Sequence, residues 1–221
     1  MKYILNLMAV ICLPGFCHAQ TFYNNGAVIH NTSGSTLFVN GNFSNATGSD
    51  LRNNGTLEVK GDITNNQLMS SFYGGTLILS GSTLQTLSGS NPLITNKLTI
   101  NNGDQVNCNL PVIVNNECKF IDAVFNTPSS SAPLRFTQNG FISVSNPPYN
   151  GSHVNGYVIK DGTGNFEYPV GDGIQYQKVD VNLSSNPNGM RVKYFAGNAG
   201  SGPFTNGGSS TVPLIEYNET E

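Results

Sequence analysis

Four carboxylates in the first half of the chain have a spacing that could serve acid–base chemistry: Glu58, Asp62, Asp104 and Glu117. Paired carboxylates cleave glycosidic bonds in many enzymes, and a stacked repeat would bring such side chains onto one outer face. Their offsets differ, however, because Glu58 lies between paired apolar residues whereas Asp62 and Asp104 lie beyond them. We therefore expect a solvated face, with no catalytic residues and no enzymatic activity.

Histidine and cysteine, the usual ligands of transition metals, are sparse after residue 20. His30 and His153 are far apart, with no Cys or acid at ligand spacing, so each is expected to be a surface or turn residue. Cys108 and Cys118 lack a matching His pair. In an oxidising compartment they could form a disulfide, or they could be two small buried apolar side chains; both interpretations stay open. The sequence predicts no metal and no cofactor.

Aromatic side chains outside the core pattern are candidates for ligand contact: Phe72, Tyr73 and Tyr149. An aromatic face can stack on a sugar ring while neighbouring amides hydrogen-bond to its hydroxyls. The same rings could instead pack against coil ends or against a second module, and we consider this the stronger interpretation.

The composition favours an all-β protein. Of 221 residues, 25 are Gly and only 10% are charged, with a formal net charge of −3. Helical bundles are rich in Ala, Glu, Lys and Arg, whereas this chain is rich in Asn, Ser, Thr and Gly. With 10 Lys and Arg against 13 Asp and Glu, the chain offers no basic surface for a phosphate backbone. Nucleic acid is therefore not an expected partner.

The first nineteen residues resemble an export signal. Lys2 is followed by an apolar run to Phe16 and by Cys17-His18-Ala19. A positive residue, a short apolar core and a small residue at the end form the pattern of a cleaved secretory signal peptide, with cleavage expected after Ala19. No later stretch is apolar and long enough for a membrane span, so we expect a secreted or surface-held chain with no integral membrane segment after cleavage.

A repeat of twenty residues carries the fold prediction. Thr36-Leu37-Phe38-Val39, Thr56-Leu57-Glu58-Val59 and Thr76-Leu77-Ile78-Leu79 are each followed two residues later by Gly, and Leu98-Thr99-Ile100 continues the series. In a strand the two apolar residues share one face and the residue between them points to solvent. This period predicts a right-handed parallel β-solenoid of about 20 residues per coil over residues 20–148, with room for about six coils. An antiparallel sandwich is the main alternative.

Pairs of asparagines lie between the strand phrases, for example at 24/25, 53/54 and 65/66. Their amides could hydrogen-bond to a stacked neighbour, or the residues could simply accommodate turns. For most of them, taken singly, we favour the turn interpretation.

The pattern changes near residue 150. Val179–Leu183 and Met190–Tyr194 alternate apolar with polar residues and flank Asn188-Gly189, which indicates an antiparallel hairpin. We expect a small antiparallel β module over residues 149–198. Residues 199–221 are interpreted as a Gly/Ser-rich linker and the truncated start of a further segment.

The order of these motifs resembles the repetitive β-rich region of large surface proteins of bacteria that use type IX secretion. The resemblance rests on the Gly-Thr-Leu repeat, then Lys97–Asn102, then His153–Val158, then the Pro-Val-Gly segment within Phe166–Gly173. Such proteins end in a C-terminal sorting domain, and none is recognisable before Glu221, so we expect a fragment of a longer product. The resemblance implies an adhesin-like or scaffold role and supplies no catalytic residues.

Two hypotheses of function follow. The first is a secreted or cell-surface structural, adhesin-like β-solenoid protein without catalytic activity, whose partner is a cell-surface or extracellular glycan or protein. The alternative is a carbohydrate-binding or carbohydrate-active β-helix protein of the polysaccharide lyase or hydrolase kind. A cluster of three or more acids and bases on one solenoid face would favour the alternative.

Overall fold

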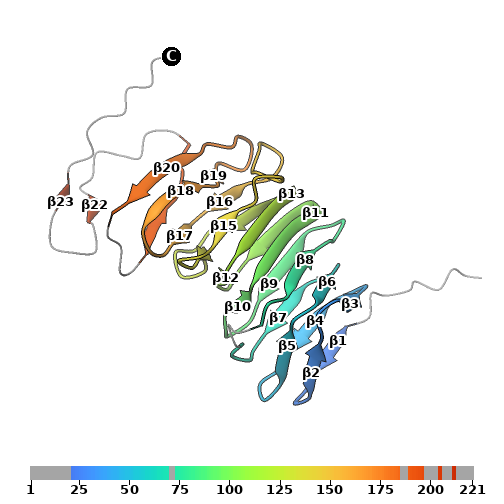
Figure 1. Cartoon of the computed structure of the whole chain (residues 1–221). Helices are drawn as coiled ribbons and strands as arrows, with labels where there is room; N and C mark the ends of the chain where they lie inside the picture. Colours follow the sequence, from blue (N-terminus) through green and yellow to red (C-terminus); the bar gives the residue numbers. More distant parts are fainter. Residues whose placement is uncertain (1–20, 70–72, 185–188, 197–203, 206–210, 213–221) are drawn as a thin grey trace, which may run out of the picture.

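The computed structural model describes residues 21–69, 73–184, 189–196, 204–205 and 211–212. Every regular element in these ranges is a β-strand. Residues 22–160 form a parallel β-solenoid of about six turns with about 21 residues per turn. The turns are stacked along one axis from β1 to β17 (Figure 1). The predicted solenoid is therefore confirmed.

Three faces surround the core, and on each face the strands of successive turns pair in parallel. Face 1 contains β1 (Phe22–Asn24), β4 (Phe43–Asn45), β7 (Ile63–Asn65), β9 (Gln85–Ser88), the second halves of β11 (Lys97–Cys108) and β13 (Glu117–Thr127), β16 (Val154–Gly156) and β19 (Val170–Gly171). Face 2 contains β2 (Val28–Asn31), β5 (Asp50–Asn53), β10 (Leu93–Thr95), β12 (Val112–Val114), β14 (Leu134–Phe136) and β17 (Val158–Lys160). Face 3 contains β3 (Thr36–Val39), β6 (Thr56–Val59), β8 (Thr76–Leu79), the first halves of β11 and β13, and β15 (Phe141–Ile142).

The repeated phrase forms face 3 in register. Leu57 pairs with Leu37 on one side and with Leu77 on the other, and the rows continue to Leu98 and Cys118. From the second turn onward these inner side chains are buried, while the residue between the two apolar positions lies at the surface. Like side chains lie above one another, so the spacing of 20 or 21 residues between the phrases sets the register of this face.

Glycine after each phrase lies at the corner between face 3 and face 1. A Cβ added to Gly61 would lie 2.5 Å from the carbonyl carbon of Gly41 in the turn before it. A Cβ on Gly81 would lie 2.6 Å from the carbonyl oxygen of Lys60. The corner therefore needs glycine because stacked backbones approach closely there.

Asparagine ladders run along the stack and include Asn24, Asn53 and Asn65, the first residue of each pair. The second residues, Asn25, Asn54 and Asn66, lie beyond the strand ends, as the turn interpretation expected. At the end of face 1, Asn24 Nδ2 donates to Asn45 Oδ1 (3.2 Å), and Asn45 Nδ2 donates to Asn65 Oδ1 (3.0 Å). On face 2, Asn31 Nδ2 donates to Asn53 Oδ1 (2.7 Å). Buried amides are stable only when hydrogen-bonded, and a stack of identical amides supplies donor and acceptor to each neighbour.

Replacing Asn45 by alanine should destabilise the fold. The substitution leaves the buried Asn24 amide without its acceptor and Asn65 Oδ1 without its donor, and we expect a loss of about 2 kcal/mol in the free energy of unfolding. Urea unfolding of Asn45→Ala and of the exposed control Asn25→Ala measures the difference. Equal stabilities of the two variants would show that the ladder contributes nothing.

The parallel stack does not stop at the predicted boundary near residue 148. β16 pairs in parallel with β13, β17 with β14, and β19 with β16. Val154 pairs with Phe125, 29 residues earlier in the chain. This long turn hides the repeat in the sequence, which is why the stack seemed to end early.

The predicted hairpin between Val179–Leu183 and Met190–Tyr194 is wrong. β20 (Val179–Leu183) pairs antiparallel with β18 (Gly164–Tyr168), and β21 (Met190–Val192) pairs antiparallel with β17. Alternation correctly identified the strands, but it carries no information about which strand is the neighbour. The short strands β22 (Phe204–Thr205) and β23 (Thr211–Val212) pair with each other; of the predicted linker, residues 199–203, 206–210 and 213–221 lie outside the described residues.

Candidate functional site

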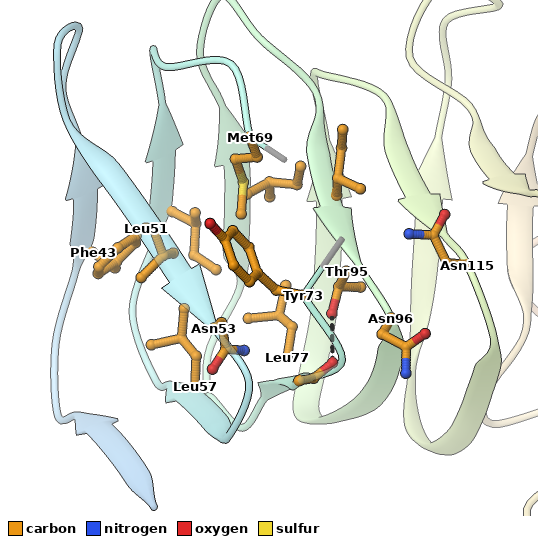
Figure 2. Close-up of a pocket in the computed structure, with 14 residues that line it drawn as sticks. Phe43, Leu51, Asn53, Leu57, Met69, Tyr73, Leu77, Thr95, Asn96 and Asn115 are labelled. Atoms are coloured by element: carbon orange, nitrogen blue, oxygen red, sulfur yellow. Dashed lines mark hydrogen bonds between the residues drawn. The ribbon is translucent and has the colours of Figure 1, made fainter. Parts of the chain in front are cut away.

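Tyr73 lies in the third turn, next to residues 70–72, which are outside the described residues. Among the described strands of face 2, β5 pairs with β2, and β10 pairs with β12. Tyr73 lies among Leu51, Met69 and Leu77 (Figure 2). The cavity that these side chains line measures about 30 Å³, roughly the space that one water molecule occupies. Tyr73 is half-buried against these side chains.

Tyr149 lies between β15 and β16, on a different turn from Tyr73. The residue is 47% exposed, and its hydroxyl donates a 2.9 Å hydrogen bond to the carbonyl of Ile121. One part of the ring lies against Gly151, where an added Cβ would come within 2.6 Å of it. Tyr149 therefore presents a fixed, partly exposed ring. Phe72, the third predicted aromatic, lies outside the described residues.

Cys108 and Cys118 are free, buried thiols, so the structure supports the second of the two interpretations left open. Cys118 pairs with Leu98 on face 3, whereas Cys108 pairs with Leu87 on face 1, and the two rows belong to different faces. The Cys108 thiol donates to the carbonyl oxygen of Leu110 (2.9 Å). Burial raises the pKa of Cys108 to about 12 and also raises the pKa of Cys118. Both serve as small apolar core residues.

His153 is fully buried, which corrects the expectation of a surface or turn residue. Its Nδ1 lies 3.1 Å from the carbonyl oxygen of Tyr149, and the Gly173 N–H donates to its Nε2 at 3.2 Å. His153 thus joins two loops of the last turns. His30 lies exposed on β2, as expected.

The four carboxylates that could have lined up differ in position and in contacts. Glu117 lies 3.7 Å from the Lys119 ammonium, and Asp62 Oδ1 accepts the Thr86 N–H at 2.8 Å. Glu58 lies half-buried at the middle position of β6, and Asp104 lies exposed on β11. Among the described residues, no three His, Cys, Asp or Glu side chains are placed to hold a metal ion together.

A polar cluster that the sequence did not reveal covers the outer face of the β18–β20 pair. Glu167 and Asp180 are directly opposite in register, and Lys178 Nζ lies 3.3 Å from Glu167 Oε2 and 3.1 Å from Asp180 Oδ2. The Tyr176 hydroxyl donates to Glu167, and burial together with this hydrogen bond raises the tyrosine pKa. An open hollow of about 530 Å³ lies here, lined by Asn165, Phe166, Glu167, Asp180, Val181 and Asn182.

The cluster can offer both hydrogen-bond donors and acceptors to a hydroxylated ligand. Its two carboxylates share a lysine rather than standing apart with different environments, so it lacks the separated acid and base of a hydrolase. A signal for it was present in the alternation of β18 and β20, but only the pairing of those two strands brings the side chains together.

Lys160 is a buried cation, with 5% of its surface exposed. Its ammonium donates to the carbonyl oxygens of Thr137 (2.7 Å), Gln138 (2.8 Å) and Gly140 (2.9 Å), and lies 5.3 Å from the centre of the Phe166 ring. Burial lowers the pKa of Lys160, and the neighbouring Asp161 partly opposes that shift. Asp161 itself pairs with Arg135 at 2.8 Å. This lysine closes the turn after β14 and has a structural role.

Comparison with protein-family models, with curated proteins and with solved structures found no match to this chain. The fold alone therefore defines its class, which is that of parallel β-solenoid proteins. Across the described part of the chain, no helix is long and apolar enough to span a bilayer.

Proposed function

We propose that this chain is a secreted or cell-surface structural protein with an adhesin-like role and no catalytic activity of its own. The observation that carries the proposal is the stacking of parallel turns around one core, with the inner rows of face 3 kept apolar while the outer position varies. On face 3 that outer position is occupied by Phe38, Glu58, Ile78, Thr99 and Lys119.

This division between apolar inner positions and variable outer positions suits a rigid scaffold that displays surface residues to a partner. Inner rows and asparagine ladders stabilise the stack, and a change at an outer position costs little stability. The resemblance to repetitive regions of type IX secretion proteins and the leader-like residues 1–19 support an exported location.

Export and the lack of catalysis can be tested in one experiment. The full-length chain is produced in a bacterial host with its own N-terminus, and cell fractions are assayed for its location and intact mass. We expect protein outside the cytoplasm that begins at Gln20, and no release of reducing sugar from a panel of polysaccharides. Full-length protein held in the cytoplasm would contradict export, and sugar release would contradict the structural role.

Carbohydrate binding is the second candidate function, favoured by the hollow on β18 and β20 with its exposed amides and carboxylates. The same purified protein can be applied to a glycan array. Capture of a glycan by the wild type and not by Asp180→Asn would assign binding to this hollow.

A further inference from the structure

The first turn leaves one end of the solenoid open. β1, β2 and β3 each have a neighbour on one side only among the described residues, namely β4, β5 and β6. Phe22 is 38% exposed, whereas Phe43 at the same position of the next turn is 2% exposed. Among the described residues, nothing covers the core or the three strand edges at this end.

Nothing in the sequence of this end protects its edges. Natural sheets guard exposed edges with charged side chains, proline or bulges. Residues 21–49 contain no Asp, Glu, Lys, Arg or Pro. Around the rim of the open end, Tyr23 is 60% exposed, Val28 is 61% exposed and Phe38 is 50% exposed. An apolar, uncharged edge of this kind is a surface for strand pairing.

The opposite end of the stack does not complement this surface. There β21 covers β17 in antiparallel pairing, and Tyr176 forms an antiparallel bridge with Gly171 of β19. Lys178, Asp180 and Arg191 add charge. Head-to-tail growth would place charged groups against an uncharged edge and would require β21 to leave its partner.

The open end is complementary to itself. A two-fold axis across it reverses the direction of every strand, so that edges of one copy meet edges of the other as antiparallel neighbours. Each uncovered apolar side chain then faces the first turn of the other copy, whose residues 21–49 include His30 but no Lys, Arg, Asp or Glu.

We propose that two copies of this chain associate end to end through their first turns, pairing the edges of β1, β2 and β3 with those of the second copy. The step rests on the proposed export of the chain, because removal of residues 1–19 leaves no leader to cover the edge.

The test measures the oligomeric state of the protein, which is expressed with residues 1–19 and purified after the host cell has processed it. Light scattering coupled to gel filtration, over a wide range of concentration, should give the mass of a dimer and nothing larger. Val28→Lys places like charges at the interface without touching the core, and should raise the dimer dissociation constant at least tenfold. Ile174→Lys, which changes a 75%-exposed apolar residue near the closed end, should leave it unchanged. Circular dichroism checks that both variants are folded.

Three results would overturn the dimer: a monomer at every concentration, masses that grow beyond two copies, or a Val28→Lys variant that associates as the wild type does. The intact mass reports separately on export. A monomer that lacks residues 1–19 would contradict the proposed dimer alone. A monomer that retains these residues would contradict both the proposed dimer and the proposed export.

Discussion

Lys160→Met is expected to lower the free energy of unfolding by about 3 kcal/mol. Methionine keeps the length and apolar stem of the side chain but removes the ammonium, which leaves the carbonyl oxygens of Thr137, Gln138 and Gly140 without their shared donor. Hydrogen bonds to a charged group contribute about 1.5–3 kcal/mol each, and relief of the desolvation of the cation offsets part of their loss. The turn after β14 should loosen first.

Urea unfolding compares this variant with Lys97→Met, in which an exposed lysine of β11 is changed in the same way. We expect Lys97→Met to lie within about 0.5 kcal/mol of the wild type. Hydrogen exchange at the 137–140 turn adds a local readout, because only loss of the ammonium contacts should speed exchange there. Equal stabilities of the two variants would mean that the ammonium contributes nothing net to the fold.

Periodicity made the stack predictable. Thr36, Thr56 and Thr76 pair in register because a constant period leaves each turn only one way to bury its two leucine or valine positions. The corner glycines followed from the same repeat. The turn between Phe125 and Val154 is much longer than the repeat, and there the predicted boundary was placed too early.

Contacts between distant residues were not predictable in this way. Lys160 follows Val158 and Ile159 in a strand pattern, and only the register that places it above Phe136 makes its position an inner one. His153 is buried because the loop containing Gly173 returns over it. The candidate site was not predictable either. The predicted residues Tyr73 and Tyr149 lie on different turns, and the polar cluster arises from the pairing of β18 with β20, whose residues carry no motif.

Alkaline pH is expected to unfold this protein through its core thiols. Burial keeps both thiols protonated in the folded chain, where the pKa of Cys108 is about 12 and that of Cys118 is also raised. In the unfolded chain a thiol ionises near its ordinary pKa of 9.0. Above that pH the unfolded state binds fewer protons than the folded state, so stability is complete below pH 9 and falls as pH rises toward 12.

The slope is about 1.4 kcal/mol per pH unit for each thiol, so the pair should remove about 4 kcal/mol by about pH 10.5. Tyr168, whose pKa burial raises to about 12, adds to the loss above its ordinary value of 10.0. Urea unfolding near pH 7.5 and near pH 10.5 measures the fall for the wild type and for Cys108→Ala/Cys118→Ala. Comparing the two pH values within each protein removes the effect of the packing that the substitutions lose. Between these pH values, the free energy of unfolding of the double variant should decrease by about 4 kcal/mol less than that of the wild type. An identical decrease in the free energy of unfolding of both proteins would contradict this prediction. It would mean that the Cys108 and Cys118 thiols do not cause the alkaline sensitivity and ionise in the folded chain as they do in the unfolded one.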